Sequence, residues 1–198
     1  MASKLTTIAQ QRSVLDYKML SRESVLWLQG KMRTVGNPAK EAKMILGESH
    51  RKTSGVQKGQ FYFYFYHAKH EDTLPYWDRF PLTLVLEKYD DGFLGLNMHY
   101  LPVMYRAAFM DKLMDYAKYD RDGELERLKV TYSILEGAKR LKAFQPCLKR
   151  YLYGYMQSKP LLLETAEWET ALFLPVERFQ KARKDKVFTD SLETIKNN

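Results

Sequence analysis

The chain has 198 residues, and its 32 lysines and arginines exceed its 24 aspartates and glutamates, which gives a formal net charge of +8. Cys147 is the single cysteine, so an intramolecular disulfide is excluded. The sequence shows no signal-peptide pattern and no apolar stretch of about 18 residues, so we expect one soluble domain, made in the cytoplasm, without a membrane partner. A charge of this size and sign favours a polyanionic partner, either nucleic acid or an acidic protein surface.

The N-terminal part of the chain is predicted to be helical. Apolar residues recur at roughly helical spacing from Ser13 to about Arg33, which predicts one or two amphipathic helices that end near Gly36. A polar, basic stretch follows and leads into a loop around Gly55. We therefore expect residues 1–58 to form a helical arm and a loop.

An aromatic segment comes next, in which phenylalanines alternate with tyrosines over residues 61–66. Side chains on a strand point to opposite faces with a period of two, so the phenyl rings face one way and the phenols the other. Two interpretations stay open. The strand belongs to the core and its second face is covered, which we favour, or the phenol face is a platform on which unpaired or terminal bases stack.

A hairpin is predicted after the aromatic strand. The stretches from Phe80 to Lys88 and from Phe93 to His99 have the composition of strands, and Asp90, Asp91 and Gly92 between them have that of a turn. Together with the aromatic segment, these stretches predict a small antiparallel sheet or partial barrel.

The C-terminal half is predicted to be mainly helical. Helices are expected at residues 103–117, 124–139 and 145–156, and the short apolar segment from Ala171 to Pro175 is expected to return to the sheet as an edge strand. The fold class is therefore α+β, with residues 59–176 as the core, covered by helices. Residues 177–198 are expected to form a basic, partly ordered C-terminal tail.

Catalytic signatures are missing from the sequence. It contains no glycine-rich phosphate loop, no nucleophile elbow and no cysteine pair. His67, His70 and Asp72 come nearest to a metal site, but their spacing matches no metal signature. The scattered carboxylates, Asp78 among them, are interpreted as solvated residues at turns and strand ends, and His99 as a satisfied core residue. We predict no enzyme activity, no cofactor and no metal.

Basic residues are concentrated in the C-terminal half, and tyrosines follow some of them closely. Cations interleaved with aromatic rings suit phosphate neutralisation and base stacking, although such clusters also occur simply as solvated faces. Trp77, in a segment between two prolines, is either a lid over the core or a contact residue. The candidate nucleic-acid contacts are Lys139, Arg140, Lys142, Lys149, Arg150, Arg178, Lys181, Arg183, Lys184 and Trp77.

Four segments resemble a family of virion proteins from T4-like tailed bacteriophages. These segments run from Lys69 to Leu82, from Asp91 to Pro102, from Cys147 to Leu152 and from Trp168 to Phe179. Together they span about the last two-thirds of the chain, in order. The family that they resemble is that of the DNA end protector, which sits on the genome end in the filled head and shields it from host exonuclease.

The resemblance implies a role that composition alone does not reach. It implies a non-catalytic virion protein that binds the end of the packaged double-stranded DNA, is present in the host cytoplasm during assembly, and contacts other virion proteins. Two alternatives stay open: a purely structural subunit of the phage neck, tail or baseplate, with protein contacts only, and a metal-dependent nuclease that uses the segment from His67 to Asp72. The resemblance carries no catalytic residue over to this chain.

Overall fold

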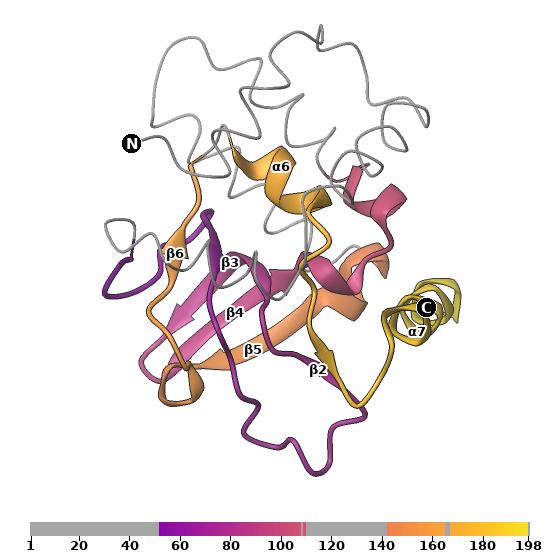
Figure 1. Cartoon of the computed structure of the whole chain (residues 1–198), viewed down its shortest axis with the longest axis horizontal. Coiled ribbons are helices and arrows are strands. Elements are labelled where there is room, and N and C mark those ends of the chain that lie inside the picture. Colours follow the sequence, from indigo (N-terminus) through magenta and orange to yellow (C-terminus); the bar gives the residue numbers. More distant parts are fainter. Residues whose placement is uncertain (1–51, 108, 110–141, 165–166, 198) are drawn as a thin grey trace, which may run out of the picture.

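A five-stranded antiparallel sheet forms the centre of the protein (Figure 1). The computed structural model describes residues 52–107, 109, 142–164 and 167–197. The spatial order of the strands is β5-β4-β3-β1-β6. Their bounds are Phe61–Phe63 for β1, Leu82–Tyr89 for β3, Gly92–Asn97 for β4, Leu148–Leu152 for β5 and Leu161–Leu162 for β6. The prediction of an α+β fold around an antiparallel sheet is confirmed.

Helices and a second, two-stranded sheet surround this centre. Strand β2 (Trp77–Asp78) pairs with β7 (Phe179–Gln180). Helix α6 (Trp168–Phe173) precedes β7 in the chain, and helix α7 (Lys184–Asn197) follows it. Short 3-10 helices follow β4, precede β5 and follow β5. They are η2 (Met98–Tyr100), η3 (Lys142–Cys147) and η4 (Tyr153–Tyr155). Within the described ranges, no helix has the length and apolar character needed to cross a membrane.

The alternation of phenylalanine and tyrosine places two different cores on the two faces of the sheet. Phe61 and Phe63 pair with Leu84 and Leu82 of β3, and all four side chains belong to the larger core, which also contains residues of α6 and α7. The tyrosines belong to a second core on the other face.

The second core is built largely from phenols and closes the tyrosine face of the sheet. Tyr62, Tyr64 and Tyr66 are 1%, 0% and 6% exposed, and they pack with Phe93 and Tyr151. The expected alternation and the core interpretation are confirmed. The stacking platform is wrong for these three tyrosines, because their rings are inaccessible to a base.

Two segments differ in type from the prediction. Leu148–Leu152 is a strand rather than part of a helix, because its alternating side chains extend the sheet beside β4. Residues expected to form an edge strand around Ala171 lie instead in α6, since that helix brings Ala171, Leu172 and Phe173 together into the larger core. In both places a short apolar stretch is compatible with either a helix or a strand, and tertiary contacts determine which of the two forms.

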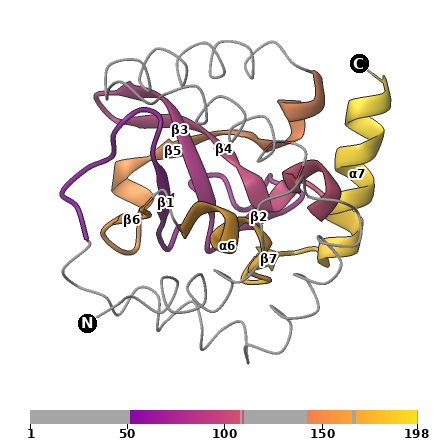
Figure 2. The same ribbon diagram turned by 90° about the horizontal axis from the view of Figure 1, so that it is seen from above.

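The C-terminal segment is more ordered than predicted. After β7 the chain enters α7, which stands beside one end of the sheet (Figure 2). Val187 and Ser191 are buried, and Ile195 packs partly against the larger core. This spacing of four residues makes one helix face that anchors an otherwise polar segment. Predictions for residues 1–51, 108 and 110–141 lie outside the described residues.

Gly92 gives a test of the packing between β4 and β5. A Cβ built on Gly92 overlaps the main-chain oxygen of Tyr151 and lies 2.9 Å from the Cα of Leu152, so strand β5 would have to move. We expect Gly92→Ala to lower the free energy of unfolding by about 2 kcal/mol or more, measured by urea denaturation. The matched control is Gly154→Ala, where a Cβ meets nothing within 4 Å, and we expect little change there. Equal stability of the two variants would contradict this packing.

Candidate nucleic-acid interface

The ribbon formed by β2 and β7 joins two segments that are 100 residues apart in the chain. Trp77 faces Gln180 and Asp78 faces Phe179 in the antiparallel register. One position further along, the main-chain nitrogen of Arg79 donates to the carbonyl of Arg178 at 2.9 Å. The ribbon therefore places two arginines from distant parts of the sequence at facing positions.

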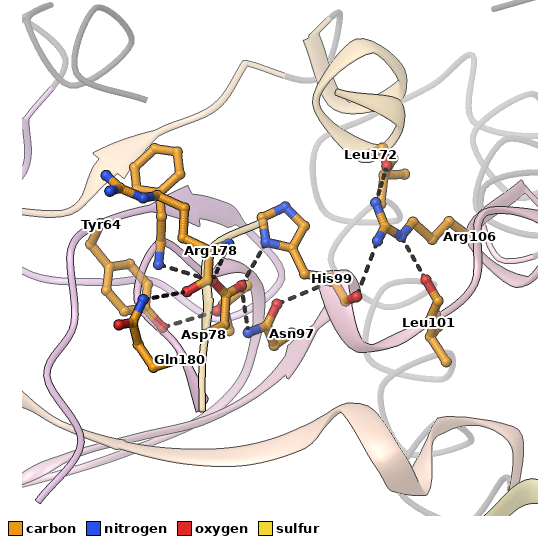
Figure 3. A network of polar contacts seen from close by, with 11 residues as sticks. Tyr64, Asp78, Asn97, His99, Leu101, Arg106, Leu172, Arg178 and Gln180 are labelled. Atoms are coloured by element: carbon orange, nitrogen blue, oxygen red, sulfur yellow. Dashed lines mark hydrogen bonds and ion pairs between the residues drawn. The ribbon is translucent and has the colours of Figure 1, made fainter. Parts of the chain in front are cut away.

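A buried carboxylate anchors this ribbon to the main sheet (Figure 3). Asp78 is 2% exposed, and its Oδ1 accepts hydrogen bonds from the main-chain nitrogens of Phe80 and Arg178, each at 3.0 Å. Its Oδ2 accepts from Asn97 Nδ2 at 3.2 Å and from His99 Nδ1 at 2.6 Å. The interpretation of Asp78 as a solvated carboxylate is wrong, because four donors satisfy it in the core. The interpretation of His99 as a core residue is confirmed by its complete burial.

The charge of Asp78 is maintained by these donors. Burial alone raises the pKa of Asp78, but the His99 ring and the hydrogen bonds to its carboxylate outweigh burial and bring the pKa below its usual value of 3.8. The folded state therefore favours the ionised carboxylate, and the ionised carboxylate favours the attachment of β7.

A buried arginine extends the network toward α6 (Figure 3). Arg106 is 1% exposed and donates to the carbonyls of Leu101 at 2.8 Å, Leu172 at 3.0 Å and His99 at 3.1 Å. Burial lowers the pKa of Arg106, while the charges of Glu177 and Asp78 raise it. The guanidinium thus ties the segment after β4 to helix α6 through main-chain oxygens.

Lys181 connects the end of β7 to the loop that precedes β2. Its main chain has a φ of 64°, an uncommon conformation for a residue other than glycine. Its Nζ donates to the carbonyl of Glu71, with further contacts to those of Asp72 at 3.3 Å and Leu74 at 3.4 Å. The ammonium group is therefore already engaged by the protein, which reduces its availability for an external phosphate.

The other predicted contacts near the C-terminus lie on the ribbon and at the start of α7. The guanidinium of Arg178 lies over the Phe65 ring at 5.9 Å from its centroid. The side chain of Arg183 is 91% exposed, and Lys184 begins α7 with a side chain that is 50% exposed. Only long ion-pair contacts hold them, 3.9 Å from Arg183 to Asp185 and 3.8 Å from Lys184 to Glu177. Arg183 and Lys184 therefore present their charge to solvent, and the partly exposed Arg178 lies a few residues before them in the chain.

The predicted contacts on β5 have other partners. The Nζ of Lys149 lies 4.2 Å from the centroid of the Tyr100 ring, and burial lowers the pKa of Lys149. Arg150 is paired with Asp91, and its guanidinium covers the ring of Tyr89 at 4.3 Å. Lys149 and Arg150 are neighbours on β5, so their side chains point to opposite faces of the sheet. Lys139, Arg140 and the side chain of Lys142 lie outside the described residues.

Trp77 occupies a core position at the edge of the ribbon. It is 9% exposed and belongs to the second core together with Tyr66 and Ala68. The ring of His67 lies 6.1 Å away in an edge-on arrangement, and the ammonium of Lys181 lies 5.8 Å from the indole centroid. A contact between Trp77 and a base stays a prediction. Little of the indole ring is accessible for such a contact.

Arg79 is the basic residue of this surface that the sequence reasoning missed. It is exposed, and it lies between Asp78 and an apolar residue, so no cluster of cations marks it in the sequence. Only the register of β2 against β7 places it opposite Arg178. A count of charge within sequence windows cannot detect such a pair.

The histidine-rich loop after β1 has the arrangement of a solvated turn. His67 Nε2 lies 3.1 Å from Glu71 Oε1, both side chains are partly exposed, and His70 and Asp72 are exposed. Among the described residues, no group of three or more histidine, cysteine or acidic side chains has an arrangement that could hold a metal ion.

Substitution of Asp78 tests whether the buried carboxylate holds the ribbon. In Asp78→Asn, the amide nitrogen would face the Asn97 Nδ2 donor, and the negative charge beside His99 would be lost. We expect the free energy of unfolding at neutral pH to fall by about 3 kcal/mol, measured by urea denaturation. Unchanged stability would show that the network is not needed.

The wild type and Asp78→Asn also give a test of the lowered pKa of Asp78, through their stability at acid pH. Because the folded-state pKa of Asp78 lies below its unfolded value, its contribution to stability is present above the unfolded pKa of about 4 and disappears as the pH falls through the folded pKa. We expect the wild type to lose stability across this acid range more steeply than Asp78→Asn, measured as urea midpoints from pH 6 to pH 2. Parallel curves would contradict a lowered pKa.

Comparison with known proteins identifies the family. A family model described as Phage T4 terminal DNA protecting protein matches residues 41–192. No curated protein and no solved structure matches the chain. The match covers well over half of the chain, it contains β2 and β7, and it ends within α7. The chain therefore belongs to the phage T4 terminal DNA protecting protein family.

Proposed function

We propose that this protein binds the end of the packaged double-stranded DNA genome and shields it from exonuclease, without catalysing a reaction. The family membership supports the role. The observation that carries it within the structure is the cationic surface of the β2–β7 ribbon and the start of α7. Arg79, Arg178, Arg183 and Lys184 lie there with few acidic partners.

The chemistry of this surface suits an end-binding role. Protection of a genome end must work on phosphates, which are present in every sequence, and lysine and arginine supply such contacts. Because Tyr62, Tyr64, Tyr66 and Tyr151 are buried in the second core, base stacking by these tyrosines is unavailable. Affinity should therefore come mainly from charge and depend steeply on salt.

The firm attachment of the ribbon suits a shield. Asp78 binds the main chain of β7 directly, through the nitrogen of Arg178 at 3.0 Å. A cationic surface held by a buried network loses less conformational entropy on binding than a free tail would lose. The protein would then act by occupying the end and excluding a nuclease.

We further propose that the protein acts in the virion and is present in the host cytoplasm during assembly, beside portal, neck, tail or baseplate proteins. A purely structural subunit would use the same cations against acidic partner chains. That alternative predicts assembly with those proteins and no affinity for DNA.

An exonuclease assay tests the shielding role. We expect the wild type to prolong the lifetime of a blunt linear duplex exposed to a processive double-strand exonuclease, and a covalently closed circle to compete poorly for the protein. Arg183→Gln combined with Lys184→Gln should shorten that lifetime, because two exposed phosphate contacts are removed. Lys88→Gln combined with Lys196→Gln removes the same charge at other exposed positions and is the matched control.

Two results would contradict the proposal. Digestion at the same rate with and without the wild-type protein would remove the shielding role. Cleavage of the duplex by the protein and magnesium or manganese alone, abolished by a chelator, would establish the nuclease alternative instead.

A further inference from the structure

Two arginines occupy facing positions on the β2–β7 ribbon. The register pairs Asp78 with Phe179, and the hydrogen bond from the Arg79 nitrogen to the Arg178 carbonyl continues this pairing. Facing residues on antiparallel strands have Cβ atoms about 5 Å apart, and like charges at such positions destabilise the pair. An anion bound between two such arginines would remove this repulsion.

The described part of the protein does not provide that anion. Neither Arg79 nor Arg178 forms an ion pair among the described residues. The adjoining carboxylate, Asp78, is turned into the core, where it already accepts four hydrogen bonds. Asp78 therefore holds the main chain of the two arginines but does not neutralise their side chains.

The surroundings of the pair favour an external ligand. Arg79 is exposed, and the Phe65 ring lies against the guanidinium of Arg178. An aromatic ring restricts a guanidinium to one plane without using its five N–H donors, which stay available for oxygen atoms. Main-chain hydrogen bonds hold both residues in place. The Arg79 nitrogen donates to the Arg178 carbonyl, and the Tyr66 nitrogen donates to the Arg79 carbonyl at 3.0 Å.

We propose that Arg79 and Arg178 form a clamp that binds a single phosphate group of the DNA at the protected end. Guanidinium groups bind phosphate oxygens in pairs with fixed geometry, and two of them on facing strands approach one phosphate from two sides. This inference rests on the proposed end-binding function, and it adds Arg79 and the chemical class of the bound group. The phosphate is either the terminal 5′ monoester or a diester near the end.

Fluorescence anisotropy with a labelled blunt duplex tests the clamp. We expect Arg79→Gln combined with Arg178→Gln to weaken binding by about tenfold or more for each arginine. The slope of log affinity against log salt should decrease in magnitude by about 0.9, since the contact with one phosphate is removed. Lys88→Gln combined with Lys196→Gln is the matched loss of charge and should change neither quantity by a comparable amount. Urea denaturation of both variants confirms that they fold.

Duplexes with and without a 5′ phosphate distinguish the two sources of the ligand. If the clamp holds the terminal monoester, the wild type binds the phosphorylated end more tightly and the double variant loses this preference. If the clamp holds an internal diester, both proteins ignore the terminal phosphate and the variant is weaker on both duplexes.

Two failures can be told apart. If the wild type binds the duplex end and the Arg79 and Arg178 variant binds with the same affinity and salt slope, the clamp is wrong and the proposed function survives. If the wild type itself has no affinity for the duplex at low salt, the proposed function fails, and the clamp with it.

Discussion

The hydrogen bonding of one buried carboxylate determines how the outer parts of this protein are placed. Asp78 joins β2 to β7 through the Arg178 nitrogen, and it joins both to the end of β4 through Asn97 and His99. Burial of a carboxylate destabilises the folded state unless the carboxylate is paired and fully hydrogen-bonded. The four donors to Asp78 lie in different segments of the chain, which must therefore be in place together. The His99 carbonyl then accepts from Arg106, which reaches α6 through Leu172. The sheet, the ribbon and α6 therefore depend on one connected set of polar contacts.

The tyrosine face of the sheet is closed by hydrogen bonds as well as by packing. Each of its phenols finds a partner: Tyr62 accepts from the Gln57 nitrogen at 3.0 Å, Tyr64 pairs with Thr83 at 2.9 Å, and Tyr66 accepts from the Leu152 nitrogen at 3.4 Å. Edge-on contacts of Tyr64 and Tyr66 with Tyr151 then close the cluster. The aromatic residues of this segment thus form a core rather than a stacking surface.

Local patterns predicted the part of the fold that local physics determines. The alternation over residues 61–66 and the turn at Gly92 are properties of short segments. The hairpin is present, and the aromatic strand is present over Phe61–Phe63, the first half of the predicted range. The strand at Leu148–Leu152 and helix α6 were missed because packing against distant segments decides their type. Asp78 and Arg79 were misread or overlooked for a related reason. The partners of Asp78 include a residue 100 positions away, and the importance of Arg79 depends on a register that no window of sequence contains.

A net charge of +8 does not by itself make a surface for DNA, because the fold engages part of that charge internally. Lys149 faces the Tyr100 ring, Arg150 is paired with Asp91, and Lys181 binds carbonyls of the loop before β2. Arg106 is wholly buried. Cations without such partners repel one another in the folded state. An anion that binds between two of them removes this repulsion. Within the described residues, the facing pair on the ribbon meets this condition best, since the main-chain pairing that holds its two strands together also holds Arg79 and Arg178 at facing positions. The same contacts that stabilise the ribbon would therefore make a phosphate favourable at its surface.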